Sequence, residues 1–194
     1  MTIINDQIYI DKILKGDTNA YAFLVEKYKG MVFSLALKMV RSSEEAEEIS
    51  QDAFIKAYKN LSTFKGASKF STWLYKIAYR TCLDNLKKNK EKYHTDTIDE
   101  ITINKIQSTD SILEGIERKE RAHIIRHCLQ SLPEEERLVL WMFYFEELSL
   151  KEITEVTDMS QTNVKVKLHR ARKRLLSIIE QKVAPEFIDH YGRK

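Results

Sequence analysis

Six basic residues and no acidic residue lie within residues 165–174. Lysine and arginine side chains bind phosphate oxygens, and they also donate to O6 and N7 of guanine in the DNA major groove. The formal net charge of the whole chain is only +3, so this local cluster predicts a surface for a polyanion. The six residues are Lys165, Lys167, Arg170, Arg172, Lys173 and Arg174.

The opposite bias occurs at residues 44–52, which carry five acidic residues and no basic one. A solvated helix face is the ordinary explanation of such a run. Its separation from the basic cluster favours two different partners, one of them basic. The acidic residues are Glu44, Glu45, Glu47, Glu48 and Asp52.

Aromatic and basic residues alternate in a loop at residues 62–69 and in the helix that follows it. Aromatic rings stack on unpaired bases while lysines bind the backbone, which is the combination that a single-stranded nucleic-acid site needs. Burial of Phe70, Trp73 and Leu74 in a core is the alternative interpretation, whereas Phe64 lies on the loop itself. The expected single-strand residues are Phe64, Lys65, Lys69, Phe70, Ser71, Trp73, Lys76 and Arg80.

The basic cluster lies in a helix-turn-helix pattern. Ser149 and Glu152 form a capping box that starts a short helix ending at Thr157, because each residue can satisfy a backbone N–H of the other. A tight turn at residues 158–160 leads into a long helix that ends near Lys182.

Two faces of this long helix follow from its spacing. Val164, Leu168, Ala171 and Leu175 share one face and can pack against Ile153 and Val156 of the short helix. The opposite face presents basic and polar residues. The residues expected to contact duplex DNA are Thr162, Asn163, Lys165, Val166, Lys167, His169, Arg170, Lys173 and Arg174.

The remaining pattern predicts an all-α protein, because 5 Gly and 2 Pro are too few for the turns of a barrel or sandwich. We expect a helix at 18–41 with a local adjustment at Gly30, and one at 43–60 opened by a capping box of Ser42 and Glu45. Ser71 or Thr72 caps a further helix to Asn89. The inward stripe of the helix at 43–60 consists of Ala46, Ile49, Ala53, Ala57 and Leu61.

The domain organisation follows from a loss of periodicity after residue 92. We expect an N-terminal helical bundle at 1–92, a flexible acidic linker at 93–110, the helix-turn-helix domain at 111–182 and a C-terminal tail at 183–194. Within the third segment, helices are predicted from Ser111 to Gln130 and at 134–145, with Pro133 in the first turn of the second.

Several classes of protein are excluded by what the sequence lacks. No phosphate loop, GxSxG or HExxH motif is present, so we expect neither an enzyme nor a cofactor. His123 and His127 have the spacing of metal ligands but no further ligand nearby, so we expect no metal. Cys82 and Cys128 form no CxxC pair, which fits a reducing, cytoplasmic compartment. The longest apolar run has eight residues, at 138–145, too few for membrane insertion.

Four stretches, in their order and spacing, resemble an extracytoplasmic-function sigma factor of the bacterial housekeeping-sigma family. They read KGDTNAYAF at 15–23, EEAEEISQDAF at 44–54, FSTWLYKIA at 70–78, and Leu132-Pro133 through the helix-turn-helix to Arg172. The resemblance covers about residues 8–90 and 112–180.

The resemblance implies core RNA polymerase as a partner, through the clamp of its largest subunit and its flap. The helix at 44–58 resembles the part that docks on the clamp. The loop at 61–69 and the next helix resemble the part that melts and reads the promoter −10 element, and the helix-turn-helix the part that reads the duplex −35 element. The docking residues carried over are Glu47, Glu48, Gln51, Asp52 and Phe54.

Two further expectations depend on the resemblance. In relatives the linker threads through the polymerase toward the RNA exit path, and an anti-sigma factor restrains the protein. The sequence departs from the family where bases are read: Tyr79-Arg80 replaces a common Arg-Asn pair, and Gln161-Thr162-Asn163 replaces a Val-Gly-Thr run. The promoter sequence therefore does not carry over. A stand-alone helix-turn-helix repressor is the alternative, although the acidic helix and the aromatic loop have no role in it.

Overall fold

The computed structural model describes residues 6–40, 42–88, 125 and 127–191, with side chains as far as residue 181. The chain divides into two compact units between residues 98 and 99. The described parts of both units are helical, which confirms the predicted all-α fold class. The predicted linker at 93–110 and the start of the helix at 111–130 lie outside the described residues.

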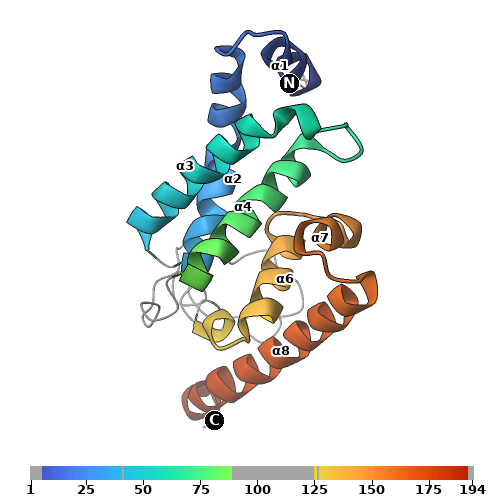
Figure 1. Cartoon of the computed structure of the whole chain (residues 1–194). Coiled ribbons are helices and arrows are strands. Elements are labelled where there is room, and N and C mark those ends of the chain that lie inside the picture. Colours follow the sequence, from blue (N-terminus) through green and yellow to red (C-terminus); the bar gives the residue numbers. More distant parts are fainter. Residues whose placement is uncertain (1–5, 41, 89–124, 126, 192–194) are drawn as a thin grey trace. The chain divides into compact units, whose positions relative to one another are not determined.

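The described residues of the first unit form four α-helices and one short 3-10 turn. Helices α2, α3 and α4 pack against one another, and α1 packs against α2 (Figure 1). The elements are α1 (Asp6–Leu14), α2 (Ala20–Val40), α3 (Ser43–Lys59), η1 (Leu61–Thr63) and α4 (Phe70–Lys88).

The predicted inward stripe is confirmed, since all five of its residues are buried, four of them in α3 and Leu61 in η1. At the start of α3 the Ser42 hydroxyl accepts the Glu45 N–H at 3.4 Å. The reciprocal half of the predicted capping box does not form, because Oε2 of Glu45 is buried without a hydrogen-bond partner. The cap therefore satisfies one backbone donor rather than two.

Helix α2 runs without interruption through Gly30. One cap prediction in this unit is wrong, and one helix was missed. Helix α4 begins at Phe70, where the Trp73 N–H donates to the Lys69 carbonyl at 3.1 Å, so Ser71 lies inside the helix and does not cap it. Helix α1 was not predicted at all, because its nine residues bury only Ile10 and Ile13, a pattern too short to stand out.

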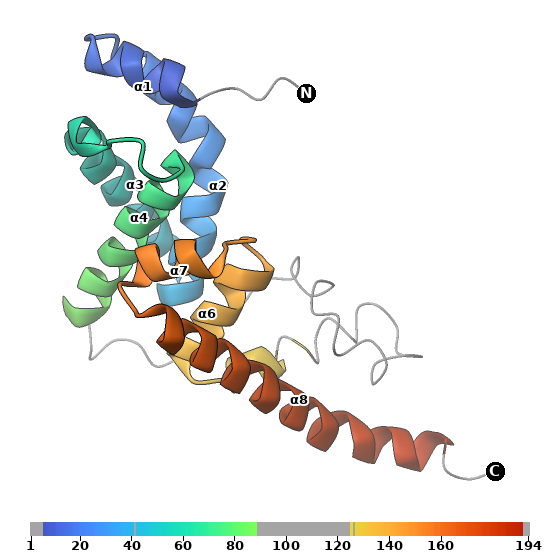
Figure 2. The same ribbon diagram turned by 90° about the vertical axis from the view of Figure 1, so that its right-hand side faces the viewer.

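The second unit contains a helix-turn-helix, with α6 and α7 packed against α8 (Figure 2). Its elements are α6 (Glu134–Tyr144), α7 (Leu150–Thr157) and α8 (Gln161–Tyr191). Helix α8 continues past its predicted end near Lys182. Pro133 is the N-cap of α6 rather than a residue of its first turn.

The turn between α7 and α8 forms as predicted. Ser149 and Glu152 make both bonds of the capping box that starts α7. Asp158 ends α7 in the left-handed conformation, at φ 58°, and its N–H donates to the Thr154 carbonyl at 3.0 Å. The Ser160 hydroxyl accepts the Asn163 N–H at 3.2 Å, which caps the start of α8.

The described residues do not meet the requirements of a membrane-spanning helix, a metal site or a disulfide. None of them has the length and apolar character needed to cross a membrane. Within the described ranges, no group of three His, Cys, Asp or Glu side chains is placed to hold a metal ion. Cys82 and Cys128 are buried and form no disulfide.

Candidate nucleic-acid interface and docking face

The inner face of α8 fixes the orientation of the basic cluster. Its four predicted core residues are each at most 4% exposed, and Ile153 and Val156 of α7 are fully buried. This apolar contact determines which side of α8 faces solvent, because positions three and four apart share one side of a helix.

The opposite side of α8 is exposed and carries the predicted base-reading residues. Arg170 and Lys173 lie near its centre with His169, and Val166 adds an apolar contact that is 40% exposed. Cations and a methyl-bearing side chain on one helix face are suited to guanine edges, phosphates and thymine methyl groups. The exposed residues of this face and its rim are Thr162, Asn163, Lys165, Val166, His169, Arg170 and Lys173.

Three cations of the cluster are directed at α6 instead. Lys167 forms an ion pair with Glu135, and Arg174 Nε lies 3.5 Å from Oε2 of Glu136. Arg172 donates to the Tyr144 hydroxyl at 2.8 Å and lies over two aromatic rings of α6. Lys167 and Arg174 are therefore engaged within the protein, which the sequence alone did not predict.

The second candidate surface, beside the loop at 64–69, is built on an aromatic cluster. Phe64 packs on Phe70 and Trp73, with ring centroids 5.6 and 5.4 Å away. The Phe70 ring also lies 5.6 Å from that of Tyr28. Phe70 is only 4% exposed, so it belongs to the core and its expected contact with DNA is withdrawn. Phe64 and Trp73 are half-buried, each with part of its surface in solvent.

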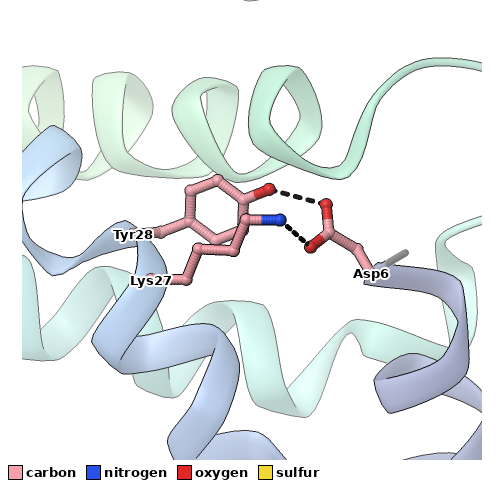
Figure 3. A network of polar contacts seen from close by, with 3 residues as sticks. All are labelled: Asp6, Lys27 and Tyr28. Atoms are coloured by element: carbon pink, nitrogen blue, oxygen red, sulfur yellow. Dashed lines mark hydrogen bonds and ion pairs between the residues drawn. The ribbon is translucent and has the colours of Figure 1, made fainter. Parts of the chain in front are cut away.

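Helix α1 braces this cluster through Tyr28. The Tyr28 hydroxyl donates to Oδ2 of Asp6 at 2.6 Å, and Lys27 Nζ lies 2.5 Å from Oδ1 of the same carboxylate (Figure 3). Burial, followed by the hydrogen bond and the negative charge of Asp6, raises the pKa of Tyr28 well above its usual value. The tyrosine therefore remains a neutral donor that ties α1 to α2.

The loop at 64–69, next to the aromatic cluster, leaves free space around the backbone of Gly66. Gly66 adopts φ +69°, and an added Cβ would meet no atom within 4 Å. Glycine is required there by the left-handed conformation rather than by crowding. Lys65 and Lys69 are exposed on this loop; further along α4, Lys76 is half-buried and Arg80 is exposed. The accessible cations and the two half-buried rings form a surface that fits an extruded base and its phosphates.

The third candidate surface is the outer face of α3. Its acidic residues Glu44, Glu47, Glu48 and Asp52 are exposed, as is Gln51. Phe54 is only 8% exposed, and its carbonyl accepts the Tyr21 hydroxyl at 2.6 Å. Phe54 nevertheless lines two hollows beside α3, so its expected docking contact stays a prediction.

The outer face of α3 also carries apolar residues that the sequence reasoning missed. Ile55 and Tyr58 are 51% and 40% exposed. Ile55 lines a groove of 690 Å³ between α2 and α3 and a second hollow of 350 Å³ toward Tyr58. A helical projection of α3 places Ile55 among the acidic residues, because Ile55 lies opposite the buried stripe. We name Gln51, Asp52, Ile55 and Tyr58, with the exposed glutamates, the α3 docking face.

Comparison with known proteins gives concordant matches. Two family models match this chain: Sigma-70 region 2 over residues 24–92 and Sigma-70, region 4 over residues 122–175. The ECF RNA polymerase sigma factor SigW of Bacillus subtilis is 35% identical over 172 residues, which cover 86% of this chain and 92% of SigW. The ECF RNA polymerase sigma-E factor of Escherichia coli K12 is 31% identical over 188 residues, or 94% and 96% of the two chains.

Solved structures share the fold at lower identity. CnrH in complex with the cytosolic domain of CnrY matches with a TM-score of 0.66 and 19% identity, over 91% of this chain and 98% of that one. The sigma factor RpoE in complex with the anti-sigma factor NepR from Bartonella quintana matches with a TM-score of 0.61 and 16% identity, over 84% and 98%.

Proposed function

The chain belongs to the extracytoplasmic-function sigma factors of the sigma-70 family, non-enzymatic proteins that direct RNA polymerase to promoters, and from this premise we propose that its three exposed surfaces divide the task. The outer face of α8 reads the −35 element, the aromatic loop surface captures the −10 element, and the α3 docking face holds the polymerase. The observation that carries the proposal is the exposure of Arg170 and Lys173 opposite the buried face of α8.

The −35 element is read as duplex DNA by α8 in the major groove. Arg170 has the fork geometry for guanine O6 and N7, which makes it the first choice for base recognition. Lys165 and Lys173 bind phosphates on either side of it. His169 and Thr162 lie on the same exposed side and complete the contact.

The −10 element is captured as single-stranded DNA beside the loop at 64–69. Phe64 and Trp73 offer partly exposed rings to an unstacked base, while Lys65, Lys69 and Arg80 lie where they can hold phosphates. Stacking contributes about 1–3 kcal/mol per base, which is comparable to the cost of removing a base from the duplex. One or two rings therefore suffice to favour the open state once polymerase is bound.

The α3 docking face binds the polymerase clamp. Its exposed acidic residues complement a basic partner and guide the encounter, because charge complementarity acts mainly on association rate and register. Ile55 supplies apolar area at the centre, and the hollows on either side can receive side chains from the partner.

An anti-sigma factor is a second protein partner in this proposal. Two solved structures that share this fold are complexes, one with the cytosolic domain of CnrY and one with the anti-sigma factor NepR. The protein acts in the cytoplasm, where it meets RNA polymerase. Gel filtration of the chain with candidate partner proteins tests for such a complex.

Run-off transcription tests the proposal as a whole. Core RNA polymerase, the purified chain and genomic fragments should give discrete transcripts that depend on the chain. Substitution of Arg170 by alanine should reduce transcript yield and relax the base preference at one −35 position. Polymerase-independent, tight binding of the chain to a palindromic operator, without transcripts, would instead support the repressor function.

A further inference from the structure

Two cations on one edge of α8 are held by the first turn of α6. Lys167 and Arg174 are seven residues apart, so they lie two helical turns from each other on the same edge. Lys167 pairs with Glu135, and Arg174 pairs with Glu136. Because the edges of a recognition helix face the DNA backbone, these pairs lie where phosphate contacts would form.

The two cations differ in their exposure to solvent. The Lys167 side chain is only 20% exposed, although it belongs to a basic surface helix. Glu136 is buried, at 7% exposed, and its partner Arg174 is 54% exposed. Both glutamates lie in the first turn of α6. Helix α6 therefore supplies fixed anions to this edge.

We propose that Glu135 and Glu136 withhold Lys167 and Arg174 from DNA phosphates and so limit the affinity of the unit for any DNA sequence. The inference rests on the proposed reading of duplex DNA by α8. Phosphate contacts strengthen binding to every sequence alike, whereas base contacts discriminate among sequences. Neutralising two edge cations lowers non-specific binding and leaves base reading by Arg170 intact. Affinity for every sequence falls by the same factor, and discrimination among sequences is left to the base contacts.

The salt dependence of binding to a non-specific duplex measures this effect. The probe is a fluorescein-labelled 20-base-pair duplex of mixed sequence, titrated with the full chain between 50 and 200 mM salt. Each phosphate contact adds about 0.9 to the slope of log affinity against log salt. Glu135→Gln frees Lys167. Between 50 and 200 mM salt, the affinity of this variant for the duplex should therefore fall about 3.5-fold more than the affinity of the wild type.

Glu134→Gln is the matched control, because it removes the same charge one residue earlier in the same helical turn. Glu134 is exposed and no ion pair of the described residues involves it. A general change of net charge would affect both variants equally. The inference predicts a steeper slope for Glu135→Gln alone. Thermal unfolding of both variants verifies that they remain folded.

A double-mutant cycle identifies the cation through which Glu135 acts. Lys167→Ala should leave the slope unchanged in the wild-type chain, where the cation is already engaged. In the Glu135→Gln background, Lys167→Ala should return the steeper slope to its original value. Equal slopes for Glu135→Gln and Glu134→Gln, or a Glu135→Gln effect that survives loss of Lys167, would overturn the inference.

Arg170→Ala separates this inference from the function on which it rests. Lower duplex affinity of Arg170→Ala supports the proposed reading face. If Arg170→Ala binds as the wild type does, the reading face fails and the inference fails with it. If Arg170→Ala loses affinity and the two glutamine variants share one slope, only the withholding role is refuted.

Discussion

Replacement of Ile55 by alanine tests the α3 docking face at the residue that the sequence did not single out. The side chain is 51% exposed and lies between two hollows, so a docked partner would cover its exposed half. Full burial of an isoleucine side chain contributes about 1.5–3 kcal/mol. Covering half of it therefore contributes about 0.8–1.5 kcal/mol, which corresponds to a Kd about 4- to 12-fold weaker in the variant.

The assay is a fluorescence titration of labelled chain with core RNA polymerase. Ile8→Ala serves as the matched control, because Ile8 is 54% exposed and lies on α1 instead of α3. Both variants lose the same atoms from a half-exposed position, so their effects on stability should be similar and small. Only Ile55→Ala should weaken polymerase binding.

Salt dependence distinguishes this contact from a charged one. Apolar contact is not screened, so the loss in Ile55→Ala should be the same at low and high salt. Wild-type affinity in Ile55→Ala would remove Ile55 from the interface. An equal loss in Ile8→Ala would show that the effect comes from general surface apolarity, and the reasoning from the hollows would be refuted.

Three further outcomes follow from the structure. Reversal of Glu48 and Asp52 to lysine should weaken polymerase binding most at low salt, and unchanged affinity in a pull-down titration would contradict the charge argument. Phe64→Ala should reduce permanganate-detected opening at the −10 element by about 5- to 150-fold while polymerase binding stays normal; Phe23→Ala, another half-buried aromatic, should open DNA at the wild-type level. Burial raises the pKa of the Cys82 thiol from 9.0 to about 12, so this thiol ionises at a lower pH in the unfolded chain than in the folded one. The free energy of unfolding should therefore fall by about 2 kcal/mol near pH 10.5. Urea unfolding of Cys82→Ala should not show this loss.

Local signals in the sequence were sufficient to predict the helix-turn-helix. The capping box of Ser149 and Glu152, the turn at 158–160 and the buried face of α8 all depend on residues within about four positions of each other. Such signals are read directly from spacing. The stripe of α3 was found in the same way. The Ser42 cap formed only in part: its hydroxyl accepts the Glu45 N–H, while Oε2 of Glu45 is buried without a hydrogen-bond partner.

The parts that could not be predicted depend on contacts between helices. Phe70 and Phe54 are aromatic residues beside a functional surface, and only the packing of α2 against α3 and α4 determines that they are buried. Helix α1 has too few apolar residues to be recognised alone, yet Asp6 reaches Tyr28 and braces the aromatic cluster (Figure 3). Sequence spacing carries no information about such partners, since they are more than twenty residues apart.

The basic cluster of α8 shows why charge counting overstates contact with DNA. All six cations lie within ten residues, and a helical projection alone places two of them on an edge that could reach phosphates. The structure engages Lys167, Arg172 and Arg174 with α6, which leaves Lys165, Arg170 and Lys173 on the exposed side. If each cation contacted one phosphate, three would give a salt slope of at most about 2.7, against about 5.4 for all six. Under the proposed function, the contacts with α6 limit how strongly the unit binds any DNA, while the residues left exposed determine which DNA it prefers.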